Sequence, residues 1–515
     1  MEEDRGRRIG RRRFVQTGLA TAVGGLLCGE ARGAPPPYKV TGWSGDEYKL
    51  GHGLRDGEHQ TRPKVSQRHD VVIVGAGVSG LTAAFKLRHL DTLVLDQASG
   101  VGGNSKGARR GQVEFNIGAA YFTGVDGEQG KLWDELGYKP RPMDHPTDRW
   151  LVGGKWVVAP WSDEGIASAP AALQGKMRAM KRALEQLVKS KDFPHNPYEK
   201  ATPNALKLDR ITFAEWLKPY AHPDLVAFVD SYCHSALGGS VKTISAYGGL
   251  NFYTEFLDDI YGFPEGNYGV VKLLTGAFEK AGKGRVVTGA LAYRLEPAGD
   301  GVRVCYVKGG KSYAVEARRA ILAVPYFVAS RLIANLSPGQ RYALNLPRYC
   351  AYVVGNLVFD RVICFDAYDN WVPRSGAFDD YITSTWTDKE QHKQLEQAGA
   401  GQVISLFAPT RSPSLGRWRM MMQKPEAFAR PMVQAFTRIF PESEARLKEV
   451  HMTRWGHAIL INQTGMYTRW LPRLQKSHGP IYLAHSDGQA LPALESSTYE
   501  AITAARNLLA RWKKG

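Results

Sequence analysis

DVVIVGAGVSG, residues 70–80, joins a short β-branched run to three glycines at a fixed spacing. An apolar run of this length predicts a strand at 70–74 that is buried on both faces. The apolar pattern at 81–90 predicts a helix, and TLVL at 92–95 predicts a second strand. Asp96 ends that strand, 21 residues after Gly75. A Gly-x-Gly-x-x-Gly turn in this context is typical of a Rossmann-type dinucleotide-binding unit.

Each glycine of that motif has a physical role. Gly75 permits the tight turn, Gly77 lets the backbone approach a pyrophosphate, and Gly80 lets the helix pack against the strand. The N-terminus of the helix offers unpaired N–H groups to the phosphates, and the acid accepts hydrogen bonds from ribose hydroxyls. The predicted cofactor contacts of this unit are Gly75, Gly77, Val78, Ser79, Gly80 and Asp96.

The first motif is shared by NAD and FAD sites, and a second glycine-rich segment favours FAD. GVGGNS at 100–105 resembles the second glycine motif of the flavin amine oxidoreductase superfamily, which includes monoamine oxidases, protoporphyrinogen oxidases and phytoene desaturases. Asn104 stands where the family usually has Arg. FNIGAAY at 115–121 resembles the family's next segment, a strand that ends beside the flavin ring. The resemblance implies FAD contacts from Gly102, Gly103, Asn104, Ser105, Gly118 and Ala119.

Two later stretches extend the resemblance. PIYLA at 480–484 is followed by an acid at 487, then by Leu494-Glu495 and a helix expected at 497–512, and this order resembles the family's C-terminal motif. There the acid lies near the FAD phosphates, and the helix N-terminus points at the flavin O2 edge. Strands expected at 284–296, 301–307 and 313–325 resemble those that flank the adenine. The resemblance implies contacts from Ala292, Asp487, Leu494 and Glu495.

The matching blocks predict an α/β fold in which a discontinuous Rossmann-type FAD-binding domain carries an inserted α+β substrate domain. Residues 34–69 are rich in Pro, Gly and charge and predict an extended arm or linker. The predicted boundaries are 70–149, 270–345 and 475–515 for the FAD-binding domain and 150–269 and 346–474 for the substrate domain.

The candidate catalytic groups come from two segments. RWGHA at 454–458 resembles the family's Trp-containing segment, which lies close to the flavin. His457 is therefore the best candidate for a titratable group beside the substrate, the alternative being a structural histidine with satisfied hydrogen bonds. Trp455 belongs to the same segment. Tyr121 is a further candidate to face the ring, and core packing is its alternative.

The resemblance implies FAD as cofactor and hydride removal from a C–N or C–C bond of a small molecule to flavin N5. Many amine oxidases place a Lys on a central strand, but the corresponding stretch 349–359 has none. Two questions therefore stay open: whether the substrate is an amine, and whether the electron acceptor is O2 or another redox partner. The alternatives are a desaturase-like dehydrogenase on an apolar substrate and a non-catalytic, flavin-loaded partner subunit.

Residues 1–33 predict a secretory leader, with a basic start, a short apolar run and a small-residue cleavage site. RRRFV at 11–15 resembles the twin-arginine consensus, which implies the twin-arginine export machinery as a partner and a periplasmic or otherwise extracytoplasmic location. No run of about 18 apolar residues follows the leader, so no transmembrane span is expected.

The net charge of +17 requires that nucleic-acid binding be considered. The cations are spread along the chain without an aromatic-interleaved basic run, so no specific nucleic-acid site is predicted. Five cysteines without a C-x-x-C pair argue against zinc and against a disulfide framework, although one or two disulfides stay open, and no metal site is predicted.

Overall fold

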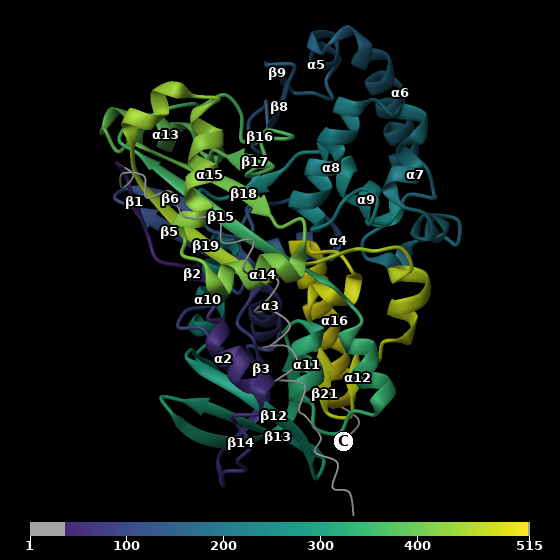
Figure 1. The fold of residues 1–515 in the computed structure, drawn as a ribbon. Coiled ribbons are helices and arrows are strands. Elements are labelled where there is room, and N and C mark those ends of the chain that lie inside the picture. Colours follow the sequence, from purple (N-terminus) through teal and green to yellow (C-terminus); the bar gives the residue numbers. More distant parts are fainter. Residues whose placement is uncertain (1–36, 513–515) are drawn as a thin grey trace, which may run out of the picture. The chain divides into compact units, whose positions relative to one another are not determined.

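The first sheet joins strands that are far apart in the sequence. Its parallel part places β3 (Val65–Val74) between β4 (Thr92–Leu95) and β14 (Lys311–Leu322), and the end of β14 pairs in parallel with β21 (Ile481–Leu483). Both faces of the sheet are covered, and the side chains of 71–74 are accordingly buried. The computed structural model describes residues 37–512, and Figure 1 shows these strands in its lower part.

Three helices cover one face of this sheet: α3 (Val78–Lys86), α10 (Tyr268–Lys280) and α16 (Leu494–Trp512). The parallel part also includes β11 (Arg285–Val287), which pairs with β4. The long strand β14 also pairs antiparallel with β13 (Gly301–Lys308), which continues to β12 (Ala290–Ala298). A mixed sheet of this kind, with helices on its face, confirms the predicted α/β class.

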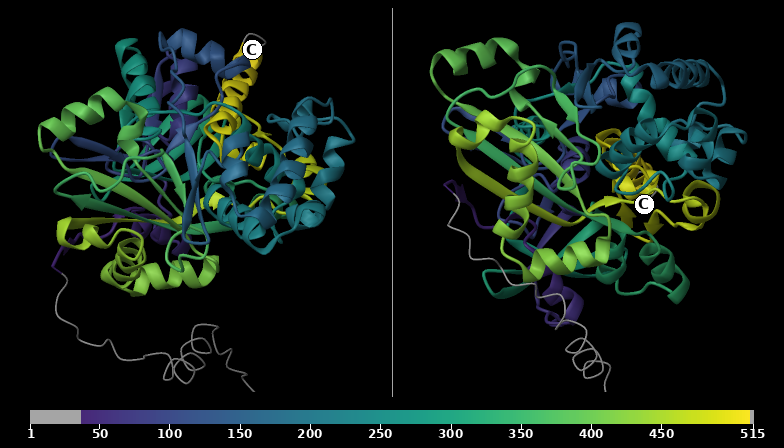
Figure 2. Two further views of the ribbon diagram at one scale, coloured as in Figure 1. Left: turned by 90° about the horizontal axis from the view of Figure 1, so that it is seen from above. Right: turned by 45° about the horizontal axis from the view of Figure 1, so that its top comes forward.

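The second sheet is largely antiparallel and carries the wall of the site described below. Its strands follow the order β19 (Leu447–Leu460), β15 (Tyr349–Phe359), β18 (Gln402–Pro409), β17 (Asp380–Ile382), β16 (Asp369–Trp371), β8 (Asp148–Val152) and β9 (Lys155–Val158). Figure 2 shows helices packed along this sheet. The helices beside it and around it are α5 (Asp163–Ser168), α6 (Ala171–Val188), α7 (Phe213–Leu217), α8 (Pro223–Leu237), α9 (Ala246–Tyr253), α13 (Lys389–Gln397), α14 (Pro413–Met422) and α15 (Glu426–Thr437).

The remaining short elements include α4 (Gly127–Leu136), α11 (Tyr326–Leu332), α12 (Pro338–Asn345), β5 (Gly107–Arg110), β6 (Val113–Asn116), β7 (Tyr121–Phe122), β10 (Tyr261–Gly262) and β20 (Ser477–His478). Among them are two separate strand pairs, β5 with β6 and β7 with β10, and a strand, β20, that pairs with β21 of the first sheet.

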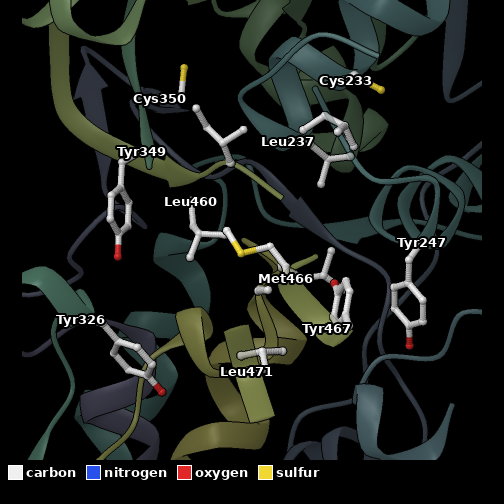
Figure 3. Close-up of a cluster of buried hydrophobic side chains, with 14 of the residues drawn as sticks. Cys233, Leu237, Tyr247, Tyr326, Tyr349, Cys350, Leu460, Met466, Tyr467 and Leu471 are labelled. Atoms are coloured by element: carbon white, nitrogen blue, oxygen red, sulfur yellow. The ribbon is translucent and has the colours of Figure 1, made fainter. Parts of the chain in front are cut away.

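A single hydrophobic cluster runs from the first sheet to the helices of the second. Figure 3 shows part of this cluster, including Leu237 of α8, Tyr349 of β15, Leu460 of β19 and Tyr467. These side chains are buried. Because the core is continuous, contacts group the chain from Val40 onward into one unit, and the finer domain boundaries stay a prediction.

The structure corrects four expectations. The expected arm contains β2 (Ser44–Gly45) and α2 (Tyr48–Asp56), which ends at left-handed Gly57, and β3 begins at Val65 rather than at 70. The helix expected at 81–90 spans Val78–Lys86, because its first turn follows the glycine turn directly. The strand expected at 284–296 is divided into β11 and β12. The C-terminal helix begins at Leu494, three residues before the expected start.

The predicted leader at 1–33, with Cys28, lies outside the described residues. Cys233, Cys305, Cys350 and Cys364 are buried and unpaired. Within residues 37–512, no helix is both long and apolar enough to cross a bilayer.

Gly80→Ala should destabilise the protein. A Cβ at Gly80 would lie 1.8 Å from the carbonyl oxygen of Gly75, which is backbone and cannot rotate away. We expect a loss of about 1–3 kcal/mol or more in the free energy of unfolding, measured by urea denaturation of the FAD-free protein.

Gly276→Ala is the matched control within α10, because nothing lies within 4 Å of its Cβ position. It should be neutral or stabilise by about 0.5–1 kcal/mol. Equal denaturation midpoints for the two variants would refute the close helix–turn packing.

Candidate active site

A cavity of about 1050 Å³ lies between the carboxyl ends of the parallel strands and the second sheet. Its size is at the upper end of the range for small-molecule and cofactor sites. Gly80 does not line it and packs against Gly75 instead. The other predicted site residues all line it: Gly75, Gly77, Val78, Ser79, Asp96, Gly102, Gly103, Asn104, Ser105, Gly118, Ala119, Tyr121, Ala292, Trp455, His457, Asp487, Leu494 and Glu495.

The two glycine segments lie side by side. Gly77 and Gly102 form a parallel bridge, and the Gly102 N–H donates to the Ala76 carbonyl at 2.8 Å. Gly102 and Gly103 have φ of +118° and +58°, which disfavour other residues. The first turn of α3 begins at this place, with Gly77 as its N-cap. Bare backbone and a helix N-terminus therefore meet at one end of the cavity, which suits a pyrophosphate.

Asp96 has a role that the sequence did not reveal. Its carboxylate accepts the Ala76 N–H at 2.6 Å and the Ala98 N–H at 2.8 Å. Burial raises the pKa of Asp96, against the lowering effect of these hydrogen bonds. The side chain thus fixes the glycine turn from the end of β4. Its predicted contact with ribose hydroxyls stays a prediction.

Close backbone approach explains the second segment. The Asn104 carbonyl accepts the Ala119 N–H at 3.0 Å, and a Cβ on Gly118 would lie 2.0 Å from that oxygen. The Asn104 amide donates to the Ala458 carbonyl at 2.7 Å. Trp455 donates its indole N–H to the Ile117 carbonyl at 2.9 Å. The 454–458 segment is therefore locked onto the second glycine segment at the cavity wall.

The C-terminal motif is held by two acids. Asp487 accepts the Tyr349 hydroxyl at 2.6 Å and the Tyr326 N–H at 2.8 Å. Burial opposes its charge, but His485 and these hydrogen bonds outweigh it and lower the pKa of Asp487. Glu495, at the start of α16, accepts the N–H groups of Thr123 and Gly124 at 2.8 and 2.6 Å. Both acids thus join distant segments at the cavity.

The sequence did not identify the N-terminal contribution to the site. Asp46, expected in a linker, accepts the Gly456 N–H, and Glu47 accepts the N–H and hydroxyl of Ser99, both at 3.0 Å. Residues of α2, which follows these two anchors directly, line the cavity. No motif in the sequence marks the anchors, because they act through tertiary contacts with residues 410 and 52 positions away.

The residues present fit FAD. A Cβ at Gly77 would meet nothing closer than the Gly103 Cα at 3.7 Å, so the folded chain itself leaves room there for a side chain. A glycine that the protein's own packing does not require, at the edge of a cavity beside a helix N-terminus, is what a closely approaching phosphate needs.

The opposite wall of the cavity carries three carboxyl groups, which we call the carboxylate cluster: Glu255, Asp369 and Asp380. Asp369 and Asp380 are 3% and 2% exposed, and one oxygen of each is buried without a hydrogen-bond partner. Strand alternation aims them inward, since Asp380 lies opposite Trp371 and Asp369 opposite Ile382, all four of which line the cavity.

No cation balances this cluster among the described interactions. Basic residues beside the two strands are engaged elsewhere: Arg374 with Asp224, Arg149 of the paired strand β8 with Asp366, and Arg411 with Asp379, each at 2.6 Å. Burial, and then repulsion from the neighbouring acids, raises the pKa of Asp369 and that of Asp380 well above the ordinary value. A cation in the cavity would reverse these shifts.

Glu255 connects the cluster to a predicted site residue. It accepts the hydroxyls of Tyr121 and Tyr232 at 2.6 and 2.7 Å. Burial raises the pKa of Glu255 to about 8, although these two hydrogen bonds lower it. Tyr121 therefore faces a carboxyl group at the cavity wall, and its contact with the flavin ring stays a prediction.

His457 lies in the cavity wall next to Phe327, with ring centroids 4.7 Å apart. Burial, and then the charge of Arg417, lowers the pKa of His457 to about 4. The imidazole is therefore neutral at neutral pH. Its catalytic role, like that of Trp455, stays a prediction.

Fold and site together define a dinucleotide-binding oxidoreductase of the Rossmann type with a second, substrate-facing sheet. A family model described as flavin containing amine oxidoreductase matches residues 78–509. The chain belongs to this family. FAD is therefore its cofactor, as predicted, and its class is that of the FAD-dependent oxidoreductases.

Individual relatives agree with this assignment. The chain is 26% identical over 220 residues to a probable flavin-containing monoamine oxidase A of Dictyostelium discoideum. The matched region covers 42% of this chain and 45% of that protein. The chain is also 36% identical over 129 residues to protoporphyrinogen oxidase 2, chloroplastic/mitochondrial, of Arabidopsis thaliana, and that match covers 24% of this chain and 25% of that protein. The matches thus span less than half the length of these curated relatives.

Solved structures share the fold. A putrescine oxidase variant with redesigned cofactor binding superposes with a TM-score of 0.66 at 16% sequence identity, covering 86% of this chain and all of that one. The overall fold of this chain is therefore shared with that putrescine oxidase structure.

Gly77→Ala should weaken FAD binding without weakening the fold. Its φ of −78° suits Ala, and its Cβ would make ordinary contacts, so the FAD-free variant should unfold at the wild-type urea concentration. The methyl group would occupy the space that the pyrophosphate needs. We expect the Kd for FAD to rise tenfold or more, measured by quenching of flavin fluorescence. An unchanged Kd would contradict the placement of the phosphates.

Proposed function

We propose that this protein oxidises the C–N bond of a small amine, which enters the cavity as a cation and is held by the carboxylate cluster. The observation that carries the proposal is the presence of three carboxyl groups without a cationic partner in the same cavity as the two glycine segments. Alkylamines are protonated at neutral pH, as the lysine side chain is, so they bring the charge that the cluster lacks.

The cluster favours an amine over the desaturase-like alternative. An apolar substrate would fill the cavity and leave one buried oxygen of Asp369 and one of Asp380 without a partner, at the cost of burying unpaired polar atoms. A cation instead pairs with them and stabilises their charged forms. Aromatic residues of the same wall, Tyr352, Trp371 and Phe407, would contact the carbon chain.

The chain's own residues would prepare the substrate for oxidation. An ammonium nitrogen has no lone pair, so it must lose a proton before its C–N bond can be oxidised. The Glu255 carboxylate, with a pKa raised to about 8, is a base of suitable strength beside Tyr121 and would accept that proton. The hydroxyls of Tyr121 and Tyr232 fix its orientation. When bound, FAD supplies the two-electron acceptor.

Anaerobic mixing of the FAD-loaded protein with substrate panels tests the proposal. Alkylamines and diamines should bleach the flavin, whereas uncharged alkenes of the same length should not. Bleaching by the alkenes alone would favour the desaturase-like alternative, and bleaching by neither panel the non-catalytic subunit. Peroxide release on admission of air would identify O2 as the acceptor, and its absence a separate redox partner.

The carboxylate cluster should control kcat/KM. For the wild type, kcat/KM should rise as the pH rises through about 8, because Glu255 of the free enzyme ionises there. Glu255→Gln should remove that rise. Asp380→Asn should lower kcat/KM tenfold or more while leaving the flavin content unchanged, as steady-state kinetics and absorption spectra would show.

Glu396→Gln is the matched control, because Glu396 is an exposed acid on α13. It should preserve both kcat/KM and its pH profile. If Glu255→Gln keeps the wild-type profile, Glu255 is not the proton acceptor. If Asp380→Asn keeps the wild-type rate, the cation binds elsewhere.

We further propose that the protein is exported in folded form by the twin-arginine route and works outside the cytoplasm. The support is sequence alone, the leader at 1–33. In a bacterial host, Arg11→Lys with Arg12→Lys should retain the flavoprotein in the cytoplasm on fractionation. Arg7→Lys with Arg8→Lys, outside the consensus, should not. Export of both variants would contradict the proposal.

A further inference from the structure

Helix α14 turns an apolar stripe outward. Leu415, Trp418 and Met422 recur at the three- and four-residue spacing of one helix face and are 55%, 40% and 67% exposed, and Met421 beside them is 42% exposed. These are four of the nine large apolar side chains that are exposed among residues 37–512. A contiguous apolar face on the surface of a protein usually marks a binding surface. We call these four residues the α14 stripe.

The fold does not need the α14 stripe for packing. The helix is attached by its other face, where Gly416 lies so close to Thr410 that a Cβ would come within 2.4 Å of the hydroxyl. Arg417 donates to the carbonyls of Tyr349 and Gly456 at 3.0 and 3.3 Å, and Met420 is buried. The residues that attach α14 therefore lie on its other face, and the α14 stripe is left exposed.

Basic residues flank the stripe. Residues 411–430 contain five Arg and Lys and one acid, Glu426. Arg411 pairs with Asp379 and Arg417 binds backbone carbonyls on the attached face of the helix. Arg419 lies beside the stripe with its guanidinium over the Phe428 ring, and Lys424 and Arg430 are exposed. Exposed apolar side chains with cations beside them are a combination that an anionic membrane surface satisfies. The net charge of +17 adds a long-range attraction to anionic surfaces.

The stripe also borders the cavity. Trp418 and Met421 line it, and residues of α2, whose Leu50 is exposed, line it as well. A surface that held the α14 stripe would therefore lie next to the part of the cavity wall that Trp418 and Met421 form.

We propose that the α14 stripe docks this protein on the surface of a lipid bilayer that contains anionic lipid, with Leu415, Trp418, Met421 and Met422 inserted among the head groups. The observations favour a bilayer over a protein partner because the exposed face combines flexible apolar side chains with basic neighbours. An anionic bilayer satisfies both at once without a shape-matched groove. The stripe does not depend on the amine hypothesis and can be tested apart from it.

Flotation of the FAD-loaded protein with vesicles tests the proposal. Vesicles of phosphatidylcholine with phosphatidylglycerol should carry the wild type, and vesicles of phosphatidylcholine alone should carry at least tenfold less. Leu415→Ser with Met422→Ser should lower the bound fraction on the anionic vesicles tenfold or more. Neither residue lines the cavity, so bleaching of the flavin in free solution should stay at the wild-type level.

Val158→Ser with Val188→Ser is the matched control, because these side chains are 44% and 43% exposed on other elements. It should bind vesicles as the wild type does. An absence of wild-type binding would overturn the proposal. Equal binding by both double variants would overturn it in favour of a non-specific basic surface. Sedimentation without vesicles must also show a monomer. A dimer that only the α14 substitutions abolish would overturn it in favour of a second copy of this chain.

Discussion

Parallel pairing of β14 with both β3 and β21 is the constraint on which the site depends. Leu322 lies opposite Val74 on one side and Leu483 on the other, so three strands from distant parts of the chain end at one level. The Ala323 N–H donates to Val74 and the Ala484 N–H to Leu322, each within 2.9 Å, which extends the alignment past the strands. Ligands of open α/β sheets bind at such aligned carboxyl ends.

Each segment that leaves this edge is fixed by a carboxylate. Asp96 holds the first glycine turn, Asp487 holds the start of α11 together with β15, and Glu495 holds the 123–124 turn at the start of α16. These acids accept backbone N–H groups and so satisfy donors that the loops leave unpaired. The carboxylate cluster differs from them, because two of its members keep buried oxygens without partners. That difference separates acids that stabilise the fold from acids that we propose to bind the substrate.

The sequence predicted the parts of this arrangement that local physics determines. The glycine turn at 75–80 and the strand at 349–359 form as expected, since positive φ and an unbroken apolar run leave few alternatives. Eighteen of the nineteen predicted site residues line one cavity, although they come from both ends of the chain, because the family resemblance supplied the tertiary arrangement.

What the sequence did not predict depends on contacts between distant segments. Asp369 and Asp380 are visible as acids inside short strands, but only the pairing of β16 with β17 aims them at the cavity. The role of Asp46 and Glu47 requires the N-terminal segment to reach 456 and 99. His457 lies in the cavity wall, as expected of a titratable group beside the substrate, but only the folded structure shows that burial lowers its pKa to about 4, and its role stays a prediction. An acid at the first position of each of two short strands, Asp369 in β16 and Asp380 in β17, is the signal that would have pointed to the cluster.

The absorption spectrum of the protein purified from riboflavin-replete cells, with the ligand released by denaturation and quantified, tests the central claim most directly. The account predicts flavin absorption bands and one FAD per chain. A colourless protein that takes up no FAD when the cofactor is added would contradict it.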